Sequence, residues 1–297
     1  VTAVSVDTPI ADAVQLLLAR GYQVAPVLNA DETVAGVLTD GDLLELAGMK
    51  ARLSLQGDLS PRVLRQQFSE LAQQTGAVGD IMSAPAMTVR EDAPIRQAAQ
   101  RMLNHRLKRL PVIDAENHLV GLVTRMDLFR LLDYHQPASA PVKPPITGAS
   151  VGELMQTEVP VVSPADGLET ILQALEQSRQ RRAVVVDVAR HVLGIITDGD
   201  ILERSQHGDD PGLLRRLRGA VSRTPFTPVA LPAGDDTAAD LMSAPATTIT
   251  LDTPLHEALD LMIWYGFKRL PVVDDAGRLV GLLGRTSLLQ GLMKTAE

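Results

Sequence analysis

The 297-residue chain contains no cysteine, and only 3% of its residues are aromatic. Without cysteine, disulfide bonds, thiol catalysis and cysteine-bound metals are excluded. No apolar run approaches the roughly 18 residues of a membrane-spanning helix. The start also lacks the basic region and apolar segment of a signal peptide, so we expect a cytoplasmic location. Because the chain begins inside a strand-like run, residues 1–6, we expect it to be part of a longer protein.

Charge and motif content exclude further classes of function. The net charge is −8, which argues against nucleic-acid binding because that usually needs a basic face. The six histidines show no metal-ligand spacing, and no catalytic triad, paired-carboxylate pattern or Walker-type phosphate loop is evident. We therefore predict neither catalytic residues nor a metal site, and no enzymatic activity. Apolar residues make up 45% of the chain, which is typical of a globular protein.

One short motif occurs four times. Gly36-Val-Leu-Thr-Asp-Gly-Asp42 returns as Gly121-Leu-Val-Thr-Arg-Met-Asp127 and as Gly194-Ile-Ile-Thr-Asp-Gly-Asp200. A degraded copy, Gly281-Leu-Leu-Gly-Arg-Thr-Ser287, lacks both the Thr and the Asp. Each copy is typical of an apolar strand that runs into a helix. Such repetition sets the architecture before any local feature does.

The four units form two related pairs. Met82-Ser-Ala-Pro-Ala reappears at Met242, and Lys108-Arg-Leu-Pro-Val reappears at Lys268, so units two and four are related. Units one and three share Thr-Asp-Gly-Asp. We interpret the chain as an A-B pair duplicated into A-B-A′-B′. The predicted boundaries are unit one 1–48, a helical connector 49–78, unit two 79–135, a Pro-rich linker 136–150, unit three 151–205, a connector 206–237 and unit four 238–297.

Each unit is predicted to follow the order strand, helix, strand, strand, helix, which gives an α/β (α+β) fold. In unit two the helix begins at Pro94, and Ile95, Ala98, Ala99, Met102 and Leu103 form its inner face at helical spacing. Strands are expected at residues 1–6 and 87–89. In the first connector Ser60-Pro61 predicts a capped amphipathic helix. In the second, Asp210-Pro211 before Leu213, Leu214 and Leu217 predicts another.

The repeated unit, with Thr-x-x-Asp at its end, resembles the CBS domain over nearly the whole chain apart from the connectors. The resemblance implies four CBS repeats paired into two Bateman modules. Members of that family regulate enzymes, channels and transporters, and their paired clefts often bind adenine nucleotides. AMP, ADP or ATP is therefore the expected regulatory ligand, with no obligatory cofactor.

The resemblance assigns ligand-binding residues at matching positions. The motif Asp would accept hydrogen bonds from ribose hydroxyls, and the motif Thr would contact ribose or phosphate. Basic residues before the Pro-Val strand would face phosphate. The assigned residues are Thr39 and Asp42; Lys108, Arg109, Thr124 and Asp127; Arg181, Arg182, Thr197 and Asp200; and Lys268 and Arg269. The same resemblance places the segments 82–87 and 242–247 along the adenine pocket.

The units differ in what they retain. Unit one has Gln23 and Val24 at the basic positions, and unit four has Gly284 and Ser287 in place of Thr and Asp. Units two and three therefore rank first as nucleotide sites, and unit two is preferred for a charged nucleotide. Asp40 and Asp198 add a second carboxylate to units one and three, which favours a cation or a ligand of low phosphate charge there.

Other interpretations of the same residues stay open. Thr-x-x-Asp before an apolar helix also predicts a capping box with no ligand, and the basic pairs could be solvated surface charges. The leading hypothesis is a ligand-sensing regulatory module that acts on a fused or associated effector and forms a homodimer. The alternatives are an interaction scaffold with vestigial clefts and a Mg²⁺ sensor built on the Asp-rich turns.

Overall fold

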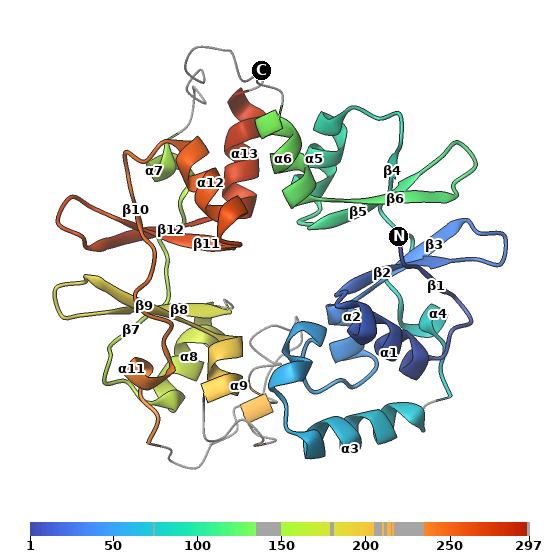
Figure 1. Ribbon diagram of the computed structural model, residues 1–297, viewed down its shortest axis with the longest axis horizontal. Coiled ribbons are helices and arrows are strands. Elements are labelled where there is room, and N and C mark those ends of the chain that lie inside the picture. Colours follow the sequence, from blue (N-terminus) through green and yellow to red (C-terminus); the bar gives the residue numbers. More distant parts are fainter. Residues whose placement is uncertain are drawn as a thin grey trace.

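The computed structural model describes residues 1–73, 75–134, 150–178, 181–204, 210, 213–214, 216 and 235–295. It contains four three-stranded sheets, one from each repeat, in the order β1-β2-β3, β4-β5-β6, β7-β8-β9 and β10-β11-β12 (Figure 1). In every sheet the first strand is parallel to the second, and the second is antiparallel to the third. The parallel pair needs a crossover, which the first helix of each unit supplies. The α/β fold class and the predicted order of elements are confirmed.

The bounds of the elements repeat from unit to unit. Unit one has β1 (Val4–Ser5), α1 (Ile10–Arg20), β2 (Val24–Leu28), β3 (Val34–Thr39) and α2 (Asp40–Glu45). Unit two has α4 (Val78–Ile81), β4 (Val89–Arg90), α5 (Ile95–Asn104), β5 (Arg109–Ile113), β6 (Leu119–Thr124) and α6 (Arg125–Tyr134). Unit three has α7 (Val151–Leu154), β7 (Val161–Val162), α8 (Leu168–Ser178), β8 (Arg182–Val186), β9 (Val192–Thr197) and α9 (Asp198–Arg204). Unit four has α11 (Ala238–Leu241), β10 (Ile249–Thr250), α12 (Leu255–Trp264), β11 (Arg269–Val273), β12 (Leu279–Gly284) and α13 (Arg285–Thr295).

Two local predictions need correction. The first strands are shorter than expected, because only Val4–Ser5 and Val89–Arg90 pair with a neighbour. Ile95, predicted on the inner face of its helix, is 43% exposed, whereas Ala98, Ala99 and Met102 are buried. Its counterpart Leu255 is buried because Leu154 of α7 and Gly291 of α13 lie beside it. Among the described residues, no such cover reaches Ile95.

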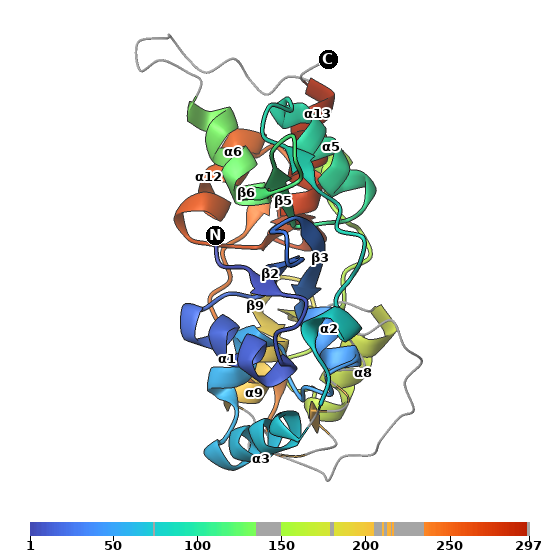
Figure 2. The same ribbon diagram turned by 90° about the vertical axis from the view of Figure 1, so that its right-hand side faces the viewer.

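The four units close into a flat ring (Figures 1 and 2). The sheets of units one and two lie side by side, joined where the Val34 amide donates to the Asn117 carbonyl at 3.1 Å. Units three and four are joined in the same way by Leu279 and Arg190 at 2.8 Å. Helices close the other two junctions. Units two and four share one hydrophobic core through α5, α6, α12 and α13, and the core of unit three takes in Ala51, Leu59 and Val63 from the first connector.

The first connector contains η1 (Leu53–Asp58) and α3 (Pro61–Ala72). The Ser60 hydroxyl accepts a hydrogen bond from the Val63 amide at 3.3 Å, so the predicted capped helix is confirmed. In the second connector Leu213 and Leu214 are buried, and Arg216 pairs with Glu176 at 2.8 Å. Of that connector the structure also describes Asp210 and residues 235–237, whereas Leu217 of the second predicted helix lies outside the described residues, as does the linker up to residue 149. No helix in the described part of the chain is long and apolar enough to cross a membrane.

Three short segments, which we call the covering segments, cross the last strand of a neighbouring unit. They are residues 82–83 over β3, 242–243 over β9 and 155–156 over β12. Each is held by a pair of backbone hydrogen bonds, for example the Ser83 amide to the Val37 carbonyl at 3.0 Å and the reverse bond at 3.0 Å. The motif glycine makes this approach possible. A Cβ on Gly36 would stand 2.6 Å from the Met82 sulfur and 2.9 Å from the Ser83 carbonyl oxygen.

Candidate functional site

The motif Thr and Asp form a capping box in units one, two and three. The Thr amide donates to Asp Oδ2 at 2.7 Å in Thr39–Asp42, 2.8 Å in Thr124–Asp127 and 2.9 Å in Thr197–Asp200. The Thr hydroxyl donates to the same oxygen, and the Asp amide donates back to that hydroxyl. The capping box that the sequence predicted as an alternative to a ligand site is therefore present in these three units. It engages only Oδ2, so the second carboxylate oxygen, Oδ1, can still bind another group.

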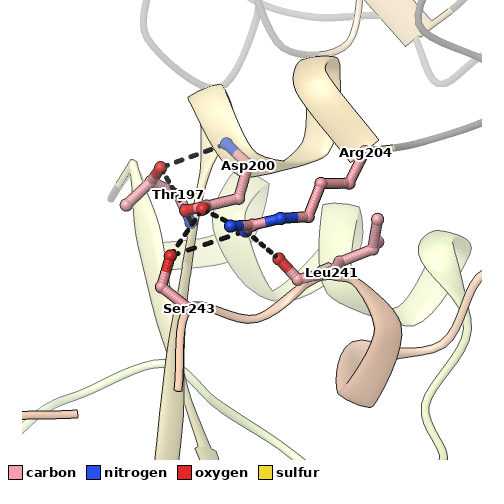
Figure 3. Close-up of polar contacts among 5 residues, drawn as sticks. All are labelled: Thr197, Asp200, Arg204, Leu241 and Ser243. Carbon is pink, nitrogen blue, oxygen red and sulfur yellow. Dashed lines mark hydrogen bonds and ion pairs between the residues drawn. The ribbon is translucent and has the colours of Figure 1, made fainter. Parts of the chain in front are cut away.

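In units one and three a serine of the covering segment contacts that second oxygen. The Ser83 hydroxyl donates to Asp42 Oδ1 at 2.8 Å, and the Ser243 hydroxyl donates to Asp200 Oδ1 at 2.8 Å (Figure 3). The segments 82–87 and 242–247, predicted to line the ligand pocket, thus begin beside the motif carboxylates. In unit four, Gly284 takes the place of the motif Thr. The Arg269 side chain covers the space left by the missing Thr side chain, and its Cγ lies 3.5 Å from where a Cβ on Gly284 would stand.

The sheet register places the second basic residue of each pair opposite the motif Thr. Arg109 pairs with Thr124, Arg182 with Thr197, and Arg269 with Gly284. In unit one Val24 pairs with Thr39, so no cation stands there. Because antiparallel neighbours present their side chains on the same side of a sheet, each basic residue and its motif are brought to the same edge.

Eight basic side chains, from the first connector and from units two, three and four, lie close enough to affect one another's ionisation, and we call them the central cation cluster. They are Arg52, Lys108, Arg125, Arg181, Arg182, Lys268, Arg269 and Arg285. Burial, together with the charges of Arg181, Arg52, Arg125 and Lys268, lowers the pKa of Lys108 to about 8. Burial and the neighbouring Arg269 lower the pKa of Arg182 to about 10.

These shifts show that the cations lack enough negative charge around them. An opposite charge would favour the charged form, whereas burial and like charges disfavour it. The Nε atoms of Arg52, Arg125 and Arg182 are buried and have no hydrogen-bond partner among the described residues. Lys108 and Lys268 are crowded by neighbouring groups, which lowers the pKa of each, yet part of each residue stays in contact with solvent, so a small anion can reach them. The predicted basic residues therefore converge on one centre rather than forming four separate sites.

Two carboxylates face this cluster. Asp198 is buried and forms an ion pair with Arg52, which crosses from the first connector to unit three. Asp40 accepts a hydrogen bond from the Leu53 amide at 3.0 Å. Burial raises the pKa of Asp40, although the Leu53 amide and the cations Arg52, Arg181 and Lys108 oppose the change. Unit one is thus close to cations supplied by other parts of the chain. Its low rank as a nucleotide site was based only on the absence of basic residues from its own strand.

The Asp-rich turns do not gather into a metal site in the described part of the chain, where no three acidic or histidine side chains could hold an ion together. Asp198 is directed to Arg52 and Asp200 to Thr197 and Ser243, so the two carboxylates of unit three serve different partners. Arg125 likewise faces away from its own motif. Its Nη1 donates to the Thr286 hydroxyl of unit four at 2.5 Å, and Nη2 donates to the Leu107 carbonyl.

Arg52 and the two serines were not singled out in the sequence. Arg52 lies in a connector with no motif around it, and only the packing of unit one against unit three brings it to Asp198. Ser83 and Ser243 belong to the repeated Met-Ser-Ala-Pro-Ala, which marks them in the sequence. Their contacts with the motif Asp could not be predicted, because they depend on how the covering segment packs on the neighbouring unit.

The family model for the CBS domain matches the chain four times, at residues 1–48, 78–134, 151–207 and 238–294. The chain belongs to the CBS-domain family. Protein MJ1225 of Methanocaldococcus jannaschii is 24% identical over 285 residues, covering 95% of this chain and 92% of the relative. Its crystal structure matches with a TM-score of 0.60 at 22% identity, covering 98% of this chain and 95% of that one.

Other relatives match less than half of this chain. CBSX2, a chloroplastic CBS protein of Arabidopsis thaliana, is 32% identical over 131 residues, which is 42% of this chain and 55% of the relative. A crystal structure of CBSX2 in complex with AMP matches with a TM-score of 0.34 and covers 44% of this chain and 86% of that one. A homoserine O-acetyltransferase of Methanosphaerula palustris is 28% identical over 132 residues, or 22% of that enzyme.

Proposed function

We propose that this CBS protein is a regulatory module that senses adenine nucleotides at clefts around the central cation cluster. The observation that carries the proposal is the cluster itself. A chain of net charge −8 gathers eight basic side chains at its centre and opposes them with two carboxylates, one of which is already paired with Arg52. Such a centre is favourable for phosphate, because several cations can share its charge.

The neighbouring groups suit the rest of a nucleotide. The motif carboxylates would accept ribose hydroxyls, and the segments 82–87 and 242–247 would lie along the base. In unit two, Thr124 ends β6 opposite Arg109, Asp127 lies in the first turn of α6, and Lys108 directly precedes Arg109. This cleft therefore remains our first choice for a phosphate-bearing ligand. Unit three follows, with Thr197, Asp200, Arg181 and Arg182. Lys268 and Arg269 of unit four and Thr39 and Asp42 of unit one complete the proposed ligand contacts.

A sensor must also change state when its ligand binds. Phosphate at the centre would touch cations from units two, three and four at once, and would thereby change how the units pack. The ligand can shift that packing only as far as it binds one arrangement better than the other. A fused or associated effector would read the change. The match to homoserine O-acetyltransferase spans a small part of that enzyme, so it gives no reason to assign catalysis to this chain.

Calorimetry and thermal unfolding against AMP, ADP, ATP and Mg²⁺ test the proposal. AMP comes first because CBSX2, a member of the family, has been crystallised with it. We expect AMP to bind and to raise the melting temperature, because a ligand that binds only the folded state stabilises it. Asp127→Ala combined with Asp200→Ala should weaken binding, since the motif carboxylates of units two and three are lost and only that of unit one, Asp42, remains.

Three outcomes would count against the proposal. A nucleotide response unchanged in the double variant would refute the assigned residues. No stabilisation by any nucleotide, together with a concentration-dependent dimer in ultracentrifugation, would favour the scaffold. Stabilisation by Mg²⁺ alone would favour the cation sensor.

A further inference from the structure

Arg204, at the end of α9, forms an ion pair with Asp200, the motif carboxylate of unit three (Figure 3). Its Nη1 lies 2.5 Å from Asp200 Oδ1 and donates also to the Leu241 carbonyl at 3.0 Å. Asp200 and Arg204 are four residues apart on one helix, with the acid first, which is the favourable order for such a pair. The guanidinium thus bridges the motif acid and the segment that leads to the covering residues 242–243.

This contact completes the hydrogen bonding of Asp200. Oδ2 accepts from the Thr197 amide and hydroxyl, and Oδ1 accepts from the Ser243 hydroxyl and from Arg204. An ionised carboxylate offers about four such positions, so all are taken. The Asp200 side chain is only 11% exposed. A ribose hydroxyl arriving there finds no free acceptor oxygen.

Unit one provides the comparison within the same chain. Asp42 has the same contacts with Thr39 and with Ser83. At the position of Arg204 it has Leu46, which is 61% exposed and cannot donate a hydrogen bond. Among the described residues, Asp42 Oδ1 therefore has one donor where Asp200 Oδ1 has two. The two sites differ at this oxygen through a single substitution.

We propose that Arg204 is a gate on the ribose site of unit three, which a nucleotide must displace before Asp200 can bind its hydroxyls. The inference rests on the proposed nucleotide function and assigns a different affinity to each cleft. A neutral hydroxyl is a weaker partner for a carboxylate than a guanidinium, so the displacement opposes binding. The Arg204 side chain is 39% exposed, and it can therefore leave the carboxylate for solvent without opening the core.

If Arg204 is such a gate, unit three should bind nucleotides more weakly than its basic residues suggest. Removing the ribose hydroxyls from the nucleotide should also change the affinity of unit three very little. The experiment isolates one cleft at a time. With Asp42→Ala and Asp127→Ala in place, AMP binding by calorimetry reports unit three. Adding Arg204→Leu, the residue found in unit one, should raise AMP affinity by about tenfold, the value of one hydrogen bond to a charged group.

A second measurement separates the gate from a general effect on structure. In the Asp42→Ala/Asp127→Ala protein, AMP and 2′,3′-dideoxy-AMP should bind nearly equally, because Asp200 is occupied. In the Arg204→Leu version AMP should bind about tenfold more tightly than the dideoxy compound. The reverse change tests the idea in unit one. With Asp127→Ala and Asp200→Ala as background, Leu46→Arg should remove the preference for ribose hydroxyls.

The outcomes distinguish the gate from the function on which it rests. If AMP binds the unmodified chain, but Arg204→Leu changes neither the affinity nor the preference for ribose hydroxyls in unit three, the gate is refuted and nucleotide sensing stands. If AMP binds neither the unmodified chain nor Arg204→Leu, both fall. Circular dichroism and urea unfolding confirm that each variant is folded before its affinity is compared.

Discussion

At the scale of single residues, Lys108 is the side chain whose charge state most directly governs phosphate binding. Its pKa of about 8, lowered by burial and by the surrounding cations, puts its titration close to neutral pH. A lysine alone in water would stay mostly charged up to about pH 10.4. Lys108 has therefore lost about half of its charge at pH 8, whereas the phosphate of AMP stays mostly doubly charged above about pH 6.

We expect AMP affinity to fall by roughly fivefold between pH 7 and pH 9, measured by calorimetry at constant ionic strength. The sign follows from the direction of the pKa shift. Below pH 8 the ammonium group is present and attracts phosphate. Above pH 8 the neutral amine predominates in the free protein, and binding must take up a proton.

Two variants serve as controls for this pH dependence. Lys108→Arg keeps a positive charge throughout the range, so affinity should stay nearly constant. Lys108→Gln should bind more weakly at pH 7 and show little further loss at pH 9. If the unmodified chain and Lys108→Gln lose affinity in parallel as the pH rises, Lys108 is not the titrating group.

At the scale of elements, a covering segment crosses closely over the motif glycine in units one, three and four. A Cβ on Gly194 would stand 2.6 Å from the Met242 sulfur and 2.9 Å from the Ser243 carbonyl oxygen. The backbone oxygen cannot give way without breaking the bonds between Ser243 and Ile195, which are 2.8 and 3.1 Å long. By contrast, a Cβ on Gly121 would meet only Val112, at an ordinary 3.5 Å.

Gly194→Ala should therefore lower the free energy of unfolding by about 1–3 kcal/mol, the usual cost of forcing an extra methyl into a packed site. Gly121→Ala is the matched control at the same motif position. It should change the free energy by less than about 0.5 kcal/mol. Urea unfolding measures both. Equal effects of the two substitutions would show that the covering segments contribute little to stability.

The sequence predicted the helices and strands better than it predicted which of them pack together. Repeats, prolines before helices and apolar stripes are local signals, and they placed the helices within a few residues. The basic residues were assigned by the resemblance to the CBS domain, and the structure places the second of each pair opposite the motif position. The contact of Arg52 with Asp198 and the exposure of Ile95 depend on which units pack together. The packing of one unit on another depends on surfaces that are far apart in the sequence, so no local sequence pattern predicts it.

At the scale of the whole molecule, the buried ion pair between Arg52 and Asp198 ties the first half of the chain to the second. The Arg52 and Asp198 side chains are 12% and 9% exposed. Removing one partner leaves the other charge buried without compensation, which typically costs about 3 kcal/mol or more. Removing both with neutral residues of similar size costs much less.

Arg52→Met should lower the free energy of unfolding by about 3 kcal/mol, and Arg52→Met combined with Asp198→Asn should recover most of that loss. Urea unfolding of the two single variants and the double variant gives the coupling between the residues. Purely additive losses would contradict the importance of this contact for holding unit one against unit three.

Like units meet like in this ring: unit one with three across the connector helices, and unit two with four in a shared core. The same arrangement would arise if two copies of an A-B ancestor associated and were later joined by gene fusion. In an assembly of identical copies every substitution appears in both halves. Once the halves share one gene, each can acquire its own mutations, so unit one can have Leu46 where unit three has Arg204, and unit two can have Asp127 where unit four has Ser287. Covalent fusion would thus have allowed one ancestral pocket to become several with different responses.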